Sequence, residues 1–204
     1  FRVGEDGPTH QPVEHEAQIR LMEHLHNHNG ERSMLVLRPA DGAETVEAWK
    51  LAMADERPVA LITSRQNIKD LPAASGERRA EAEQAAKGGY IVCDTENPKA
   101  VLIASGSEVS TLVEGAELLA AEGIGVRIVS VPSEGLFRDQ SKEYQQSVLP
   151  AGLPRYGMTA GLPVTLEGLV GENGRIHGVD HFGYSAPYKV LDEKFGFNGA
   201  TVAA

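Results

Sequence analysis

The sequence predicts an α/β protein in which the end of a doubly wound, parallel-sheet domain is followed by a second α/β domain with a mostly parallel, mixed sheet. Residues 58–63 read Pro-Val-Ala-Leu-Ile-Thr, an apolar run that is typical of a strand covered on both faces in a parallel sheet. A similar run covers residues 34–37, and residues 44–54 between them have a helical pattern. Strand, helix and strand form one β-α-β unit, whose crossover we expect to be right-handed.

A loop and a helix precede this unit. The run Gly4-Glu5-Asp6-Gly7-Pro8-Thr9-His10-Gln11-Pro12 contains two glycines and two prolines, which favours a loop over a helix or strand. Pro12 then predicts the start of a helix that continues to about His28, because proline is favoured in the first turn. Glu14 and Glu16 suit the positive end of that helix dipole.

Beyond residue 88 strands and helices alternate again. The expected strands cover residues 90–94, 99–104, 125–131 and 175–180, and the expected helices cover about 142–149, about 187–194 and the stretch between Ser105 and Gly123. Ser105 and Glu108 have the spacing of a capping box at the start of that last helix. The alternation predicts the second α/β domain.

Residues 68–88 separate the two domains. Their low hydrophobicity, with prolines and glycines at the flanks, predicts an interdomain linker. The expected boundaries are therefore 1–67 for the first domain, 68–88 for the linker and 89–204 for the second domain.

The composition narrows the classes of function. The net charge is −10 and there is no long run of lysine or arginine, so neither a nucleic-acid partner nor a membrane partner is predicted. The single cysteine, Cys93, excludes an intrachain disulfide and suits a reducing, cytoplasmic location; its apolar neighbours predict a buried, inert thiol. The chain begins at Phe1 without a signal-peptide pattern, and we expect it to be a fragment of a larger protein.

The histidines do not predict a metal site. His24 and His28 would share one face of a helix and could bind zinc, but His26 points elsewhere and no cysteine or acidic cluster completes a site. Solvated histidines at a polar helix end are the better interpretation. His177 and His181 are also four residues apart, again without a supporting ligand.

Three motifs, in one order along the chain, resemble the transketolase family. The first is the loop Gly4 to Pro12, which is similar to the substrate loop in the family's pyrimidine-binding domain. The second is Ser64-Arg65-Gln66-Asn67, which follows the strand over 58–63. The third is Gly183-Tyr184-Ser185-Ala186-Pro187, which is similar to a G-x-S-A-P signature near the family's carboxyl terminus.

The resemblance implies a transferase that moves a two-carbon ketol unit between ketose and aldose phosphates in the pentose phosphate pathway. The family uses thiamine diphosphate and a divalent cation, Mg²⁺ or Ca²⁺, and acts as a homodimer on sugar phosphates. By motif, His10 is similar to the catalytic histidine that contacts substrate hydroxyls, Asp6 to a carboxylate that binds a hydroxyl, and Arg65 to the phosphate-binding arginine. Residues 1–67 would then be the end of the pyrimidine-binding domain, and residues 89–204 the C-terminal domain.

Other parts of the family's site are missing from this sequence. They are the glutamate that pairs with the aminopyrimidine, the aromatic residue that stacks on it, the G-D-G…N metal pattern, and a second substrate histidine before the loop. We therefore expect no cofactor-binding or metal-binding residue in this chain and no cofactor bound to it. We also expect the chain alone to be inactive.

Two other interpretations stay open from the sequence. The chain could belong to a related thiamine enzyme, such as a deoxyxylulose-phosphate synthase or a two-oxoacid dehydrogenase subunit. Alternatively, residues 89–204 could act as a non-catalytic dimerisation or regulatory domain, since no catalytic residue is identified there.

Overall fold

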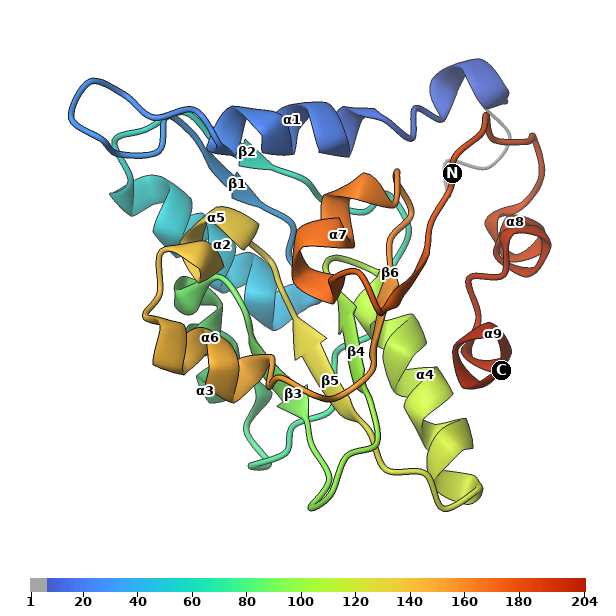
Figure 1. Cartoon of the computed structure of the whole chain (residues 1–204). Coiled ribbons are helices and arrows are strands. Elements are labelled where there is room, and N and C mark those ends of the chain that lie inside the picture. The colour runs from blue at the N-terminus through green and yellow to red at the C-terminus, as the bar shows by residue number, and fades with distance from the viewer. Residues whose placement is uncertain (1–6) are drawn as a thin grey trace.

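The computed structural model describes residues 7–204, and its first domain contains a two-stranded parallel sheet (Figure 1). β1 (Leu35–Leu37) pairs in parallel with β2 (Val59–Leu61), and α2 (Gly42–Ala54) connects them. The 3₁₀ turn η1 (Pro8–His10) and α1 (His15–Glu23) precede β1, and α1 lies across the top of the molecule in Figure 1. The predicted β-α-β unit is confirmed.

The second domain has a five-stranded mixed sheet with the strand order β3-β5-β4-β6-β7. Its strands are β3 (Tyr90–Cys93), β4 (Val101–Ala104), β5 (Arg127–Ser130), β6 (Arg155–Met158) and β7 (Arg175–His177). β3 runs antiparallel to β5, whereas the other neighbours are parallel. The predicted fold class, with a mostly parallel, mixed second sheet, is therefore confirmed.

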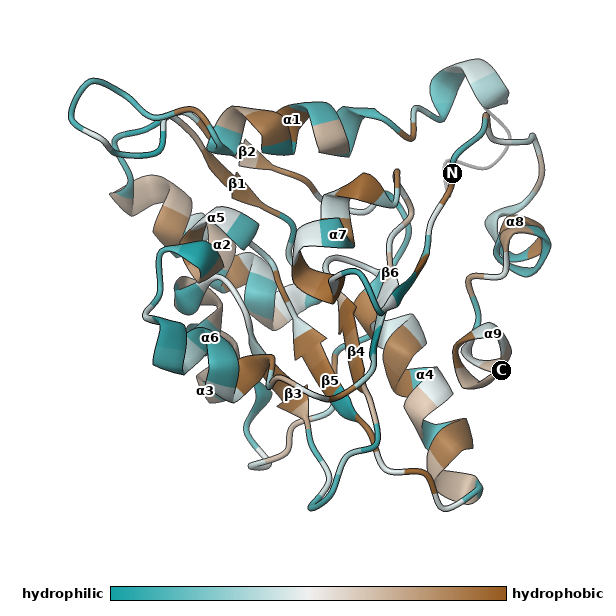
Figure 2. Ribbon diagram, viewed as in Figure 1, coloured by the Kyte–Doolittle hydropathy of each residue, from teal (hydrophilic) through white to brown (hydrophobic). Residues whose placement is uncertain are grey.

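Helices cover both faces of this sheet (Figure 1). On one side lie α4 (Glu108–Ala121), α8 (Tyr188–Phe195) and α9 (Gly199–Ala203), and on the other lie α5 (Glu134–Arg138), α6 (Lys142–Val148) and α7 (Val164–Val170). Alternate residues of β4 point to opposite faces, as the pleat of a strand requires. Leu102 and Ala104 join the core under α4, whereas Val101 and Ile103 join the core under α7. Figure 2 accordingly shows β4 and β5 as mostly apolar strands.

The segment 68–88, predicted to be a linker, is a packed part of the fold. It contains α3 (Arg78–Ala82) and the 3₁₀ turn η2 (Glu83–Lys87), both in contact with α2. Leu71, Ala82 and Ala85 are buried. The hydrophobicity is low because the buried alanines are small and most of their charged neighbours are exposed, so average composition does not reveal the packing.

The predicted capping box at the start of α4 is wrong. The N-cap residue is Ser107 rather than Ser105, and its side chain makes no capping hydrogen bond to the backbone. The Ser105 hydroxyl instead accepts hydrogen bonds from Arg38 and Arg20. The Glu108 carboxylate binds Arg38. A tertiary ion pair therefore takes the place of local capping.

Helix α1 ends earlier than predicted, at Glu23 instead of about His28. The Asn27 side chain explains the difference, because its Oδ1 accepts hydrogen bonds from the backbone N–H groups of Asn29 and Glu31. Such local side-chain hydrogen bonds compete with a helix.

Four elements were not predicted: α5, β6, α7 and α9. Each contains a glycine, which weakens the local signal for a helix or strand. Tertiary contacts stabilise them instead: β6 pairs with β4 and β7, α7 packs on β6, and α9 packs on α4. Over residues 7–204, we find no helix that combines the length and the apolar character needed to span a membrane.

Candidate functional site

A cavity of about 490 Å³ lies where the two domains meet. Its walls come from the carboxyl ends of strands in both sheets: Arg38 follows β1, residues 64–69 follow β2, Ser107 follows β4 and Ala160 follows β6. Ligands of open parallel sheets bind beyond the carboxyl ends of strands. This position makes the cavity, hereafter the interdomain cavity, a candidate binding site.

The side chains of the interdomain cavity suit an anionic ligand. Four cationic side chains line it, against two carboxylates, and five hydroxyls and two amides complete the polar lining: Arg38, Arg65, Lys69 and Lys189; Glu114 and Asp192; Ser64, Ser107, Ser110, Thr111 and Tyr188; Gln66 and Asn67. At least two of the cations are paired with carboxylates: Lys69 Nζ lies 3.0 Å from Glu114 Oε1, and Arg38 pairs with Glu108. Ammonium, guanidinium and hydroxyl groups are the donors that phosphate oxygens accept.

Of the three predicted site residues, the structure places one at the interdomain cavity, places one outside its lining and does not describe the third. Arg65 is exposed and lines the interdomain cavity beyond the end of β2, where the sequence places it. His10 is exposed in η1, its Nδ1 lies 3.0 Å from Thr9 Oγ1, and it is not among the residues that line the cavity. Asp6 lies outside the described residues. The substrate contacts that the resemblance implies for these three side chains therefore stay predictions.

Arg38 is a residue of this region that the sequence reasoning missed. Its guanidinium is nearly buried and donates from Nη2 to Glu108 Oε2 at 2.5 Å and from Nη1 to the Ser105 carbonyl at 2.8 Å. Its Nε lies 3.4 Å from Glu16 Oε2. Arg38 thus joins β1 and α1 of the first domain to the start of α4 in the second. A lone arginine after a strand carries no sequence signal for these partners.

Two members of this cluster, Arg38 and Glu16, are held in the ionised form by their oppositely charged neighbours. Burial tends to lower the pKa of Arg38, but the carboxylates of Glu108 and Glu16 outweigh burial and raise that pKa. Burial tends to raise the pKa of Glu16, but Arg38 and Arg20 outweigh it and lower that pKa. We infer that Arg38 and Glu16 stay ionised around neutral pH.

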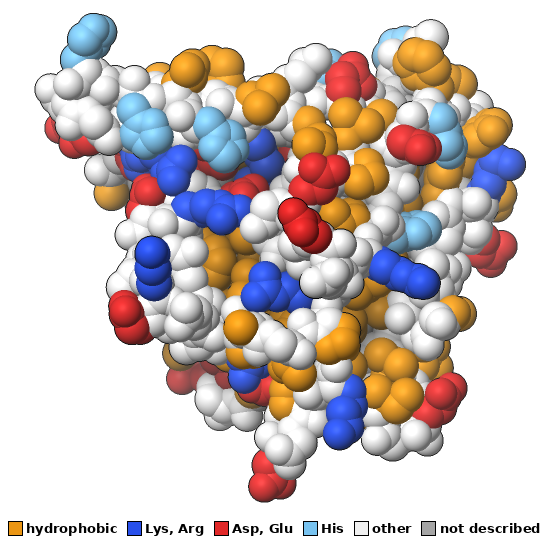
Figure 3. All heavy atoms as spheres, viewed as in Figure 1, with side chains coloured by type: hydrophobic (Ala, Val, Ile, Leu, Met, Phe, Trp, Pro, Cys, Tyr) orange, Lys and Arg blue, Asp and Glu red, His pale blue; other side chains and the backbone are white. Residues whose placement is uncertain are grey.

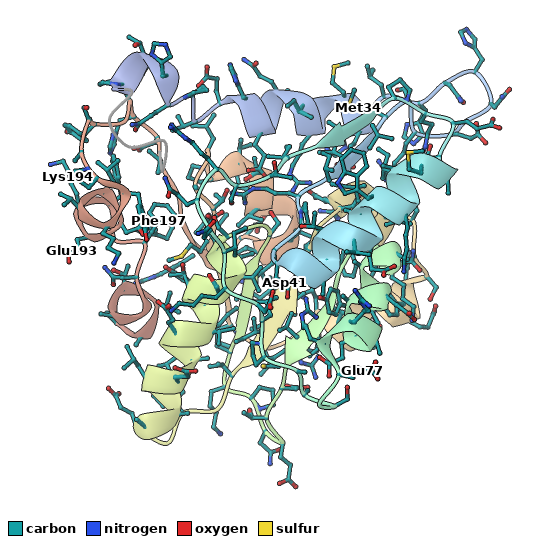
Figure 4. The ribbon with its side chains drawn as sticks, turned by 180° about the vertical axis from the view of Figure 1, so that it is seen from behind. Met34, Asp41, Glu77, Glu193, Lys194 and Phe197 are labelled. Atoms are coloured by element: carbon teal, nitrogen blue, oxygen red, sulfur yellow. The ribbon has the colours of Figure 1, made fainter. Side chains whose placement is uncertain are left out.

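A second buried polar cluster joins α2, α3 and β3. The Arg78 Nε donates to Asp41 Oδ2 at 2.6 Å, and the Tyr90 hydroxyl donates to Glu44 Oε1 at 2.6 Å. Asp41 begins α2 as its N-cap (Figure 4). Burial raises the pKa of Glu44, and burial together with the Glu44 charge raises the pKa of Tyr90. The two clusters hold the domains together through ionic and hydrogen-bonded contacts.

The histidines and the cysteine form no second site among residues 7–204, where no group of three or more potential metal ligands occurs. His24, His26 and His28 are exposed, and Figure 3 shows histidine side chains at the surface over α1 and the loop after it. The Nε2 of His177 lies 2.7 Å from the Phe195 carbonyl oxygen. Cys93 is half-buried rather than buried, and burial raises the pKa of its thiol, which disfavours a reactive thiolate.

Two family models match the chain in sequence order. A model described as transketolase, pyrimidine binding domain, matches residues 1–70. A model described as transketolase-like TK C-terminal domain matches residues 88–198.

Curated sequences and solved structures agree with these matches. The chain is 44% identical to a plasmid-encoded transketolase of Cupriavidus necator over 99% of this chain and 28% of that protein. It superposes on the transketolase from Leishmania mexicana with a TM-score of 0.84 and 38% identity, over 98% of this chain and 27% of that one. For the transketolase from Campylobacter jejuni the TM-score is 0.83 at 34% identity, over 98% of this chain and 29% of that one. The chain thus spans between a quarter and a third of the length of these relatives.

Proposed function

The chain belongs to the transketolase family, and we propose that it forms the carboxyl-terminal part of a transketolase. Residues 1–67 would be the end of the pyrimidine-binding domain, residues 68–88 a packed connecting segment, and residues 89–204 the C-terminal domain. The match of both family models, in order and over nearly the whole chain, is the observation that carries this proposal.

The complete enzyme would transfer a two-carbon ketol unit between ketose and aldose phosphates, as a homodimer in the cytoplasm. Its cofactors would be thiamine diphosphate and a divalent cation, Mg²⁺ or Ca²⁺. The cationic lining of the interdomain cavity, which includes Arg65, is compatible with phosphorylated substrates. Transketolase relatives at 44% identity favour this activity over that of a deoxyxylulose-phosphate synthase or a two-oxoacid dehydrogenase.

The described residues do not by themselves fit thiamine diphosphate. The cation that holds a diphosphate needs several oxygen ligands, and residues 7–204 contain no cluster of potential metal ligands. We therefore propose no metal-binding residue among residues 7–204, and the absence of cofactor-binding residues from this chain stays an expectation from the sequence. The cofactor, when bound to the complete enzyme, would supply the carbanion chemistry, and this chain would supply contacts to the sugar phosphate.

Each of the three proposed substrate contacts uses a side chain whose chemistry suits the substrate group that it would bind. The His10 imidazole can give or take a proton at a substrate hydroxyl near neutral pH. The Asp6 carboxylate accepts hydrogen bonds from hydroxyls, and the Arg65 guanidinium can bind a phosphate through two parallel hydrogen bonds. A sugar phosphate held at both ends would present its reacting carbon in one orientation.

Replacing Arg65 by alanine in the complete enzyme is expected to raise KM for ribose 5-phosphate about tenfold or more, because a charge-assisted hydrogen bond contributes roughly 1.5–3 kcal/mol. Steady-state kinetics would measure this, with an unphosphorylated aldose as the control substrate. KM for the control should not change. An unchanged KM for ribose 5-phosphate would show that Arg65 does not bind the phosphate.

The chain alone is expected to bind thiamine diphosphate weakly, because the glutamate and aromatic residue that hold the pyrimidine in the family are missing from this sequence. Isothermal titration of the chain with thiamine diphosphate and Mg²⁺ should give no micromolar affinity. The complete enzyme, titrated in the same way, serves as the positive control. Micromolar binding to the chain would contradict the expectation of no cofactor-binding residue.

A further inference from the structure

The loop that carries His10 contacts the second domain through the side chain of Gln11, the next residue. Gln11 is only 1% exposed, although it follows an exposed turn and is polar. Its Nε2 donates a hydrogen bond to the Tyr184 carbonyl oxygen at 2.9 Å. The two residues are 173 positions apart, so this contact joins the first and third motifs of the sequence.

The backbone at residue 183 comes unusually close to this side chain. A Cβ atom added at Gly183 would overlap the amide oxygen of Gln11 and lie 2.8 Å from its Cδ. Only a glycine leaves room there for the Gln11 amide. The glycine of the G-x-S-A-P segment therefore has a steric role, because its missing side chain forms part of the pocket for Gln11.

A second contact holds the chain two residues after Gln11, at the same end of the loop. The Leu162 N–H donates to the Val13 carbonyl oxygen at 3.1 Å, and the Val13 side chain belongs to the hydrophobic core of the second domain. A Cβ atom at Gly161 would lie 3.1 Å from the same carbonyl oxygen, so the backbones are in close contact. The loop is thus bound to the second domain at Gln11 and at Val13, on the carboxyl side of His10.

The part of the second domain under the loop is itself well supported. The Val179 N–H donates to the Gly161 carbonyl oxygen at 2.9 Å. The Tyr184 ring lies 4.3 Å from Lys194 Nζ, in a cation–π contact, and 5.7 Å from the Phe195 ring. The contacts of the Tyr184 ring attach this segment to α8, at the right of Figure 1. These contacts therefore fix the position of the Tyr184 carbonyl group that Gln11 binds.

We propose that Gln11 is a positioning residue, through which the second domain sets the place of His10 in the substrate-binding loop. The inference rests on the proposed function, because it assigns Gln11 to the loop that contacts substrate. It gives residues 89–204 a role in the reaction without a catalytic residue of their own. Displacing a catalytic group by about 1 Å can lower the rate roughly a hundredfold, so loosening the Gln11 side chain should affect turnover strongly.

The test uses the complete enzyme with the variants Gln11→Met, Gln11→Ala, Gly183→Ala and Gln11→Ala/Gly183→Ala. Gln11→Met keeps most of the volume but removes the hydrogen-bond donor, and we expect kcat to fall about tenfold to a hundredfold. KM for ribose 5-phosphate should stay within about twofold, since Arg65 is untouched. Hydrogen exchange over residues 7–13 should speed up, because an unanchored loop opens more often.

Gly183→Ala should lower kcat by a similar factor, because its methyl group displaces the Gln11 amide. On the Gln11→Ala background the same substitution should have a much smaller effect, since the overlapping amide is gone and only the Cβ of residue 11, 3.0 Å away, remains near the added methyl group; this non-additivity would show direct contact. Gly42→Ala is the control: its added methyl group would meet Asp70 at an ordinary 3.4 Å, and kcat should not change.

Two results would overturn the positioning role. One is a kcat within twofold of wild type for Gln11→Met, and the other is a lower kcat with unchanged exchange over residues 7–13. Additive effects of Gln11→Ala and Gly183→Ala would exclude the contact itself. If the wild-type enzyme had no transketolase activity, the proposed function would fail, while the exchange data would still decide whether Gln11 anchors the loop.

Discussion

Replacing His10 by alanine in the complete enzyme is expected to lower kcat by about a hundredfold or more, the loss typical of a group that transfers protons in the transition state. The side chain is exposed on η1, so its removal leaves no buried cavity and should not unfold the protein. Steady-state kinetics with a ketose phosphate donor and ribose 5-phosphate would measure the effect. Thermal unfolding of the same variant should match wild type.

His28→Ala is the matched control for this experiment. His28 is also an exposed histidine outside a helix or strand, but it lies in the loop between α1 and β1, away from the three motifs. Its replacement should leave kcat within about twofold of wild type. If His10→Ala retained activity to the same degree, His10 would be a structural part of the loop and the proposed proton transfer would be wrong.

The second large effect is expected at Arg38, whose replacement by methionine should lower the free energy of unfolding by about 3–5 kcal/mol. The reason is that Glu108, with a fully buried side chain, would lose its cationic partner and remain as an unpaired buried charge. Urea unfolding of the chain at neutral pH would measure the loss. Because the same guanidinium also contacts Glu16 and the Ser105 carbonyl, the variant should weaken the contact between the domains first.

Arg138→Met provides the comparison. Arg138 pairs with Glu134 within one helical turn at 2.8 Å, and its side chain is 35% exposed. Exposed ion pairs contribute about 0–1 kcal/mol, so this variant should lose at most that amount. A loss of less than about 1 kcal/mol for Arg38→Met as well would show that the buried cluster does not stabilise the fold.

Much of the fold could be predicted because its strongest signals are local. The apolar run 58–63 and the helical pattern before it predicted a β-α-β unit, and the structure has that unit. The packing of segment 68–88 was not predicted, because its buried residues Leu71, Ala82 and Ala85 have charged neighbours along the chain. Average hydrophobicity over a window does not show which side of a short helix faces a neighbouring domain.

For the candidate site too, some features could be predicted from the sequence and others could not. By itself, the sequence determined the fold class, the family and the residues of the three motifs, because these depend on residue types in a fixed local order. Only the tertiary structure showed that Arg38 binds Glu108, 70 positions away, and that Gln11 binds the Tyr184 carbonyl, 173 positions away. The physical reason is that a buried charge or amide needs an ionic or hydrogen-bonding partner of the right geometry. Which distant group becomes that partner depends on how the chain folds in three dimensions.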